Sequence, residues 1–288
     1  MRFRLKAFGF HLLGSVTMLT LVMGVLYLGW YHWPGWYLTG MPTLALVVIS
    51  VDVVLGPLVT LLIASPAKRA RTLAGDIAVI VAVQLCALAY GAHTLWGGRP
   101  LYYAFSEDRV EAVQAQDLDA KEIALARTQN PGFTPHWYSL PRWVWAPLPK
   151  DDKTSRQIIA SAISGGNDVV DMPRYFKDWA QGSSTLRERL KPLDKLTDFT
   201  GLERQSLREQ LTKLGLDPTR PDYLLMTGRT RPVLLVMDHQ SLRIREWLRA
   251  HPRIPPPHYG KHRRHKPGWT ERFPWLETWV ERIRSVFS

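Results

Sequence analysis

Three long stretches of apolar residues fill the first third of the chain. Phe8–Trp30 has 23 residues without a charge, Met41–Ala64 has one charge in 24 residues, and Ile77–Trp96 has none in 20. Apolar runs of about 20 residues are long enough to cross a bilayer as helices. We therefore predict transmembrane helices at about 8–30, 41–64 and 77–96, which together form a membrane domain over residues 1–98.

Up to the third predicted span, basic residues occur in every second segment outside the spans, so all of these fall on one side of the membrane. Three precede the first span (Arg2, Arg4 and Lys6), and three more separate the second from the third (Lys68, Arg69 and Arg71). The linker Tyr31–Gly40 has no Lys, Arg, Asp or Glu, and its aromatic residues suit the membrane interface. The first run is longer than the apolar core of a signal peptide and lacks an A-x-A cleavage pattern, so we predict that it stays uncleaved. The positive-inside rule then places the N-terminus in the cytoplasm and the residues after the third span in the periplasm of a bacterium.

Shorter patterns of mixed character follow from Arg99. Leu101–Phe105 and Val110–Val113 flank a polar turn and predict a β-hairpin. The pattern predicts helices at 118–128, 151–163, 173–179, 185–193 and 202–214, and strands at 223–227, 232–237 and 242–247. The Pro- and Trp-rich stretch 131–149 is predicted to be irregular. Strands at both ends of a helical middle favour a small α+β domain with an antiparallel sheet over residues 99–250.

The last segment, 251–288, is basic and rich in Pro, His and Trp. Its residues 274–287 can form an amphipathic helix that lies on a membrane, docks on a partner or covers its own domain. The three His at 258, 262 and 265 are interleaved with basic residues, which favours attraction to anionic lipid headgroups over metal binding.

The net charge of +12 is spread as +4, +3 and +5 over 1–98, 99–250 and 251–288. This spread argues against a nucleic-acid footprint on one domain.

Asp52 at the middle of the second span is the most informative single residue. A carboxylate inside a membrane span is costly and usually marks a proton relay or a partner contact. Gly56 and Pro57 follow one turn later, where a helix loses a backbone hydrogen bond and bends. Tyr90 and Thr20 come out at about the same depth, so a purely structural hydrogen bond to Asp52 is the alternative.

Other polar residues of the spans carry weaker signals. His11 and His93 are expected near opposite edges of the membrane, roughly 20 Å apart, so one metal ion or haem cannot use both. Gln84 is a further intramembrane polar candidate. The single cysteine, Cys86, excludes an intrachain disulfide and a multi-cysteine metal site. Small residues in the third span are candidates for close contact with a partner helix: Ala78, Ala82, Ala87 and Gly91.

The soluble part shows no catalytic motif. It has no G-x-S-x-G, no P-loop, no G-x-G-x-x-G and no S-x-x-K with K-T-G, so we expect no enzyme activity and no cofactor. Aromatic residues are common interface anchors, which makes the Trp-rich stretch a candidate for partner binding. Its candidate residues are Trp137, Trp143 and Trp145, with packing on its own sheet or on the bilayer surface as the alternative.

Several strings resemble the type IV pilin accessory proteins of the TfpX/TfpZ family when taken in order. They are RLKAFGFHLLGS at 4–15, GWY at 29–31, VDVVLGPLVTLLI at 51–63, DIAVIVAVQLCALAYG at 76–91, and RPLYYAF followed by DRV at 99–110. The resemblance is close over residues 1–115 and looser to about residue 247. The residues that carry it include Asp52, Gly56, Pro57, Gln84 and Arg109, whereas the tail after about residue 251 lies outside it.

The resemblance implies an inner-membrane accessory protein that assists the stability, assembly or surface display of a type IV pilin without catalysis. It also implies the major pilin as a partner, and we expect Arg109 among the partner-binding candidates. Two other functions stay open from the residues themselves. One is a proton-coupled membrane component or membrane enzyme that uses Asp52 with Tyr90 or His93, and the other is a periplasmic ligand sensor.

Overall fold

The computed structural model describes residues 1–196 and 199–249, and the predicted tail helix lies outside them. Within the described residues the chain forms two compact units. The membrane unit comprises Met1–His32 and Met41–Gly98. The sheet unit comprises Trp33–Gly40 and residues 99–249. The division falls after Gly98, except that the linker Trp33–Gly40 belongs with the sheet unit.

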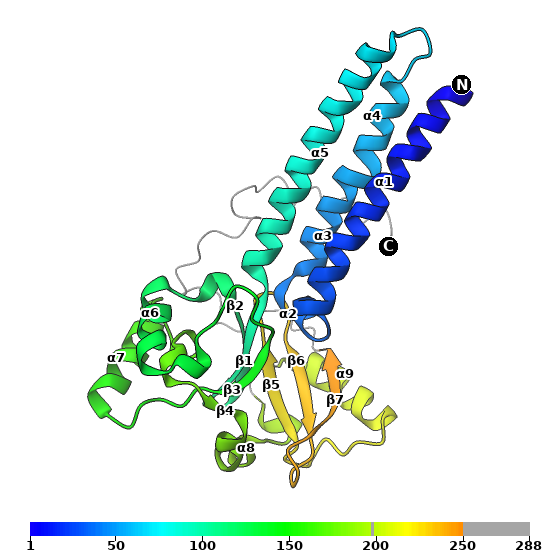
Figure 1. Cartoon of the computed structure of the whole chain (residues 1–288). Helices are drawn as coiled ribbons and strands as arrows, with labels where there is room; N and C mark the ends of the chain where they lie inside the picture. Colours follow the sequence, from blue (N-terminus) through cyan, green and yellow to red (C-terminus); the bar gives the residue numbers. More distant parts are fainter. Residues whose placement is uncertain (197–198, 250–288) are drawn as a thin grey trace. The chain divides into compact units, whose positions relative to one another are not determined.

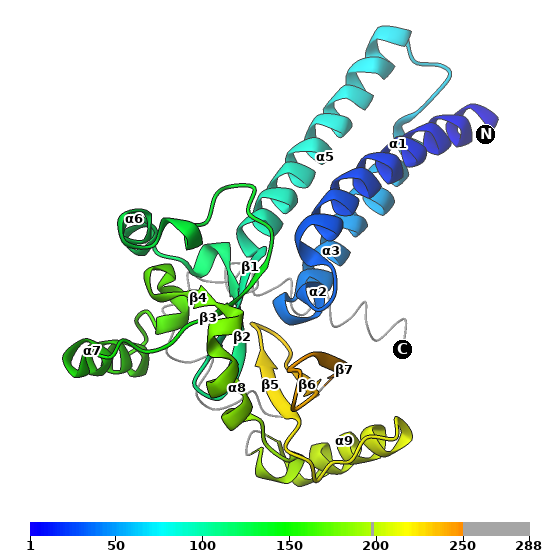
Figure 2. The same ribbon diagram turned by 60° about the horizontal axis from the view of Figure 1, so that its bottom comes forward.

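The membrane unit contains three apolar helices that are long enough to cross a membrane, as predicted. The first is α1 (Arg2–Leu26), which continues as the π-helical turn η1 (Tyr27–Tyr31). The second is built from α3 (Met41–Ile49), the π-helical turn η2 (Ser50–Leu55) and α4 (Gly56–Ile63). The third is α5 (Ala70–Gly98). Figures 1 and 2 show the three running side by side.

Close packing holds this helical unit together at several depths. Leu19, Val48 and Leu88 from the three helices form a shared apolar cluster. Gly91 allows Val48 to approach α5, because a Cβ at Gly91 would lie 2.5 Å from the Val48 side chain. At one end, the Tyr31 hydroxyl donates a hydrogen bond to the Leu95 carbonyl at 2.6 Å.

The sheet unit is organised around one sheet, with seven strands in its described part, in the order β4-β3-β1-β2-β5-β6-β7. The strand bounds are β1 Pro100–Ser106, β2 Arg109–Gln114, β3 Arg142–Trp145, β4 Lys177–Asp178, β5 Tyr223–Thr227, β6 Val233–Met237 and β7 Ile244–Arg249. The hairpin β1–β2 and the strands β5, β6 and β7 confirm the sequence prediction.

The prediction of a wholly antiparallel sheet is wrong, because the sheet is mixed. Strand β1 pairs in parallel with β3, and β2 pairs in parallel with β5, while the other pairs are antiparallel. Parallel neighbours need a connection of a dozen or more residues. The chain supplies one between β2 and β3 and a longer one between β3 and β5, and neither pairing leaves a local signal in the sequence.

Both faces of the sheet are covered. One face, with Tyr103, Phe105 and Leu235, packs against Tyr37 and Leu38 of the linker and against α8. On the opposite face, α6 and α7 cover the β1–β3 half and α9 covers the β5–β7 half (Figure 2). This double cover explains why β5 and β6 are buried at every position.

After Gly98, the described helices of the sheet unit follow the sequence pattern with one exception. They are α6 (Ala120–Gln129), α7 (Asp152–Ile163), α8 (Ser183–Arg189) and α9 (Gly201–Lys213). The predicted helix at 173–179 is wrong: the chain forms short 3-10 turns around β4, where Asn130 donates to the carbonyls of Pro173 and Phe176. The 3-10 turns are η3 Ala115–Asp117, η4 Pro131–Phe133, η5 Val169–Asp171, η6 Pro173–Tyr175, η7 Trp179–Gly182 and η8 Leu193–Lys195.

The stretch 131–149, predicted to be irregular, and the linker between the first two spans are both ordered by contacts far along the chain. Strand β3 lies inside the predicted loop 131–149, because Val144 is fully buried where β3 pairs with β1. In the linker, the short helix α2 (Gly35–Thr39) packs on the sheet, and the Leu38 carbonyl accepts from the Thr230 backbone N–H at 3.1 Å. A Cβ at Gly228 would lie 2.5 Å from that same carbonyl, so the approach depends on glycine.

Candidate functional site

At the centre of the site is the Asp52 backbone carbonyl, which receives no hydrogen bond from its own helix. In the π-helical turn η2 the Gly56 N–H donates to the Val51 carbonyl instead of to Asp52. The next residue, Pro57, has no N–H to donate. The Asp52 carbonyl therefore receives no backbone hydrogen bond, neither from Gly56, the α-helical donor, nor from Pro57, the π-helical position. A π-helical turn of this kind is frequent at functional sites.

The Gln84 side chain of α5 donates a hydrogen bond to this carbonyl. Its side-chain Nε2 donates to the Asp52 backbone oxygen at 2.9 Å and approaches the Ser15 hydroxyl at 3.5 Å. Gly56 makes room for the amide, because a Cβ there would lie 2.0 Å from Gln84 Nε2. Gln84 thus ties α5 to the second span and to α1.

His11 of α1 completes the network with both ring nitrogens. Its Nε2 lies 2.5 Å from Gln84 Oε1, and its Nδ1 lies 2.5 Å from the Thr60 hydroxyl of α4. Because the Asp52 carbonyl can only accept, Gln84 must turn its Oε1 toward His11. The His11 Nε2 then carries the proton, and Nδ1 accepts from Thr60. A neutral His11 therefore has both of its hydrogen-bonding positions filled.

The Asp52 side chain is outside this network. It is only 4% exposed, and neither carboxyl oxygen has a hydrogen-bond partner among the residues that the structure describes. It lines a cavity of about 480 Å³ between α1 and α5. The walls of the cavity are Ala7, Phe10, His11, Gly14, Ser15 and Met18 on one side and Ile77, Val81, Gln84, Leu85 and Leu88 on the other, with Asp52 and Thr60 between them. We call this cavity the α1–α5 groove.

The sequence prediction named Asp52, His11 and Gln84 separately, and the structure brings them together. Tyr90 and Thr20 lie at a similar depth, but both are exposed on the outside of the helices and neither donates to Asp52. Tyr90 is six residues after Gln84, which turns it about 120° around α5. His93 is also exposed, and the described residues contain no group of three His, Cys, Asp or Glu that could hold a metal ion.

The small residues of α5 lie on two different faces. Gly91 is buried against Val48 and Ala87 is half-buried, so these two serve the packing of the unit itself. Ala78 and Ala82 are exposed and remain available to another helix.

Relatives of the chain carry consistent names. Two fimbrial assembly proteins of Dichelobacter nodosus, from serogroups I and E1, are 25% and 24% identical to it over 241 residues, which is 82% of this chain and 91% of each relative. A third, from serogroups C1 and C2, is 30% identical over 124 residues, which is 43% of this chain and 95% of that relative. The chain belongs to this family of fimbrial assembly proteins. No protein-family model and no solved structure matches it.

The longer alignments within this family include both units. At 241 residues they exceed the length of either described unit. The resemblance drawn from the sequence motifs therefore holds at the level of a fimbrial assembly protein, over more of the chain than the membrane helices alone.

The partner-binding candidates of the sheet unit have different environments. Trp143 and Trp145 lie in β3 and pack on the core beside α8, with Trp143 5.0 Å from both the Tyr103 and the Trp179 ring. Trp137 is 73% exposed in the loop before β3. Arg109, beside the hairpin turn, pairs with Asp108 at 2.8 Å. The structure therefore leaves Trp137 as the aromatic candidate with a large accessible surface.

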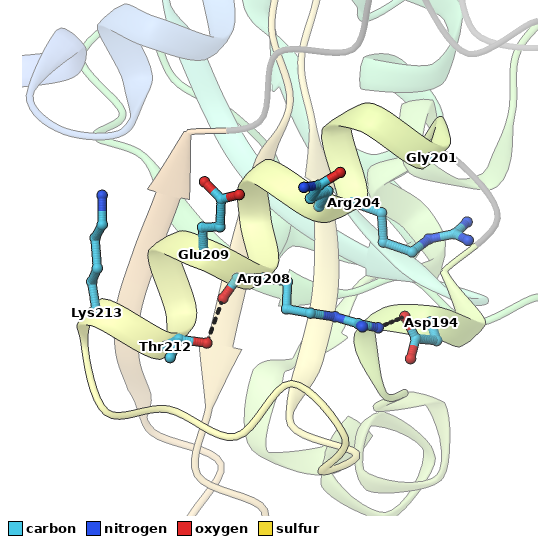
Figure 3. Close-up of a pocket in the computed structure, with 8 residues that line it drawn as sticks. Asp194, Gly201, Arg204, Arg208, Glu209, Thr212 and Lys213 are labelled. Carbon is cyan, nitrogen blue, oxygen red and sulfur yellow. Dashed lines mark hydrogen bonds and ion pairs between the residues drawn. The ribbon is translucent and has the colours of Figure 1, made fainter.

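A hollow of about 860 Å³ beside α9 has a structural explanation (Figure 3). Arg208 pairs with Asp194 of η8 at 2.6 Å, and Arg204 donates to the carbonyls of Leu196 and Phe199. These arginines fasten α9 to the chain that precedes it. We assign no ligand to this hollow.

Thr60 and Ser15 are members of the network that were not predicted from the sequence. Thr60 lies eight residues after Asp52 and Ser15 four after His11, so each shares a helix face with a residue that was named. That spacing was the available signal.

Proposed function

We propose that this protein is a non-catalytic accessory factor of the bacterial inner membrane that assists the assembly, stability or surface display of a type IV pilin. The observation that carries the proposal is the similarity to fimbrial assembly proteins over more than 200 residues, through both units. The motifs shared with type IV pilin accessory proteins support the finer assignment to a pilin.

The proposed orientation follows from the charges beside the spans. Three basic residues lie in the first turns of α1, and Lys68, Arg69 and Arg71 lie just before or at the start of α5, whereas the linker between the first two spans has no charged residue. This distribution favours a cytoplasmic N-terminus and a periplasmic sheet unit.

The two units suit a partner that also has a membrane helix and a periplasmic head. We propose that the membrane unit contacts the pilin helix and that the sheet unit, through the loop with Trp137, contacts the head. Ala78 and Ala82 on the outer face of α5 offer close approach to a second helix. This division of contacts needs no reacting group in either unit.

The test is a pull-down of the tagged full-length protein from its native membranes, probed for the pilin, together with a surface-pilus assay in the deletion strain. We expect pilin in the pull-down and lost or altered piliation. An empty pull-down with normal pili would contradict the proposed function.

A second candidate function is a proton-coupled membrane component. The buried Asp52 carboxyl beside the His11 network is the observation that favours it. Under this alternative, Asp52→Asn abolishes a proton-dependent activity while pilin retention is unchanged, and Asp52→Glu keeps the activity. Under the accessory function, pilin retention itself changes.

A further inference from the structure

We propose that the α1–α5 groove binds one transmembrane helix of another protein, and that this helix carries a hydrogen-bond donor in its middle that bonds to the Asp52 carboxyl. The inference rests on the proposed function only in requiring a partner that crosses the same membrane. It adds the place where the partner binds and the chemistry that selects it.

The first argument is the state of Asp52. Its carboxyl oxygens have no donor within the described chain, although the side chain is nine-tenths buried and lines the groove. Leaving a buried carboxyl without a partner is costly, and intramembrane carboxyls usually pair or line a pathway. A donor from outside this chain removes that cost.

The second argument is that the neighbouring polar groups cannot supply the donor. The Gln84 amide is held by the Asp52 backbone carbonyl and by His11. His11 donates to Gln84 and accepts from Thr60, so the neutral ring has no second proton to give. The network uses the donors of these groups, so none of them serves the Asp52 carboxyl, whose oxygens lie buried at the wall of the groove.

The third argument is the shape and depth of the groove. Its walls run from Ala7 to Met18 on α1 and from Ile77 to Leu88 on α5, about 16 Å or three helical turns on each side. Asp52 lies 11 residues from each end of its span Met41–Ile63, which places it about 16 Å from both ends. Lipid acyl chains have no donor at that depth. A groove three turns long with apolar walls matches a helix better than it matches a small polar molecule.

Its rim is apolar and accessible. Phe10 is 75% exposed, Met18 45% and Leu85 47%. An apolar helix can pack on these side chains and bring one polar residue over Asp52. The recognised feature is therefore a single donor, such as an amide or ammonium group, within an otherwise apolar span.

The experiment uses the full-length protein in lipid vesicles and two synthetic peptides. One peptide is a Leu/Ala helix of about 20 residues, and the other is the same helix with one central Gln. The photocrosslinker p-benzoylphenylalanine replaces Phe10 or Leu85 at the rim of the groove. Matched controls carry it at Leu13 or Val83, which are exposed on the same helices but do not line the groove.

We expect crosslinks to the Gln peptide at the two rim positions and not at the two control positions. The Gln peptide should bind about 3- to 30-fold more tightly than the Leu/Ala peptide, which is the range for one interhelical hydrogen bond in a membrane. Asp52→Leu should make the two peptides bind equally. The comparison of positions needs no change at Asp52, so it stays valid if that variant does not fold.

Three results would overturn the proposal. They are equal crosslinking at rim and control positions, equal binding of the two peptides to the unaltered protein, and crosslinks within the chain or between two copies of it. The last would assign the groove to the chain itself. Because no pilin is present in this assay, its failure leaves the pull-down result standing, and a failed pull-down leaves this assay standing.

Discussion

The buried carboxylates of the two units have contrasting surroundings. In the sheet unit, Glu122 lies 3.3 Å from the Arg174 guanidinium and Asp222 lies 3.0 Å from that of Arg220. In the membrane unit, the Asp52 carboxyl has no hydrogen-bond partner among the described residues. A buried carboxylate that pairs with an arginine of its own unit has a structural role. A buried carboxyl without such a partner, at the membrane depth where a charge costs most, is better explained by a contact with another protein.

Removal of one partner in the sheet unit should have the largest effect on stability. Arg174→Met leaves Glu122 buried without its cation, and we expect the free energy of unfolding to fall by about 3–5 kcal/mol. The control is Arg156→Met, because the pair Arg156–Asp152 is exposed and should contribute less than about 0.5 kcal/mol. Urea unfolding of the full-length protein in detergent measures both. Equal effects would show that the Glu122 pair is not structural.

This variant should also change the pH dependence. Burial raises the pKa of Glu122, and Arg174 lowers it in part. Without Arg174 the pKa of the folded-state carboxyl rises further above its value in the unfolded chain. The folded protein then binds the proton more tightly, so stability rises as the pH falls from neutral toward about 4.3, the ordinary pKa of Glu. The deficit of Arg174→Met should therefore shrink in acid, and a deficit that grows would contradict the assignment.

Two of the three tryptophans of the 131–149 stretch, Trp137 and Trp143, allow packing and partner contact to be tested separately. Trp143→Ala removes ring contacts with Tyr103, Trp179 and Trp247, and should cost about 3 kcal/mol. Trp137→Ala removes a side chain that is 73% exposed and should change stability by less than about 0.5 kcal/mol. If Trp137 contacts the pilin head, its variant lowers pilin recovery in the pull-down at unchanged stability. Normal recovery would remove Trp137 from the proposed interface.

The membrane unit allows a matched test with two glycines. Gly56→Ala places a Cβ against the Gln84 amide, which must move and give up its bonds to the Asp52 carbonyl and to His11. We expect a loss of about 1–3 kcal/mol. Gly24→Ala on α1 meets no atom within 4 Å and should be neutral or slightly stabilising. Thermal unfolding in one detergent compares them, and equal behaviour would argue against the network.

How far the sequence predicts these features depends on how local their causes are. Apolar length specifies the three spans, and the alternation on either side of Ser106–Arg109 specifies the hairpin. The parallel pairings of β1 with β3 and β2 with β5 join segments far apart in the chain, so no short window contains them. The same applies within the membrane unit. Gly56 and Pro57 mark a freed carbonyl, but the rotation of α1 and α5 decides that His11 and Gln84, rather than Tyr90 and Thr20, lie beside Asp52.

Asp52→Asn should have little effect on stability, although Asp52 is as buried as Glu122. The change removes a carboxyl that makes no hydrogen bond within the described chain, and it leaves the backbone carbonyl that Gln84 uses. An amide is also less costly than a carboxylate in a span, so we expect the unfolding free energy to stay within about 0.5 kcal/mol or to rise. Gln84→Leu is the matched variant, since it breaks the network beside Asp52 and should destabilise the unit. A large loss of stability in Asp52→Asn would place this carboxyl with Glu122 as a structural group. Unchanged stability with reduced pilin recovery would instead separate the two kinds of buried carboxylate, one retained for the fold and the other for a partner.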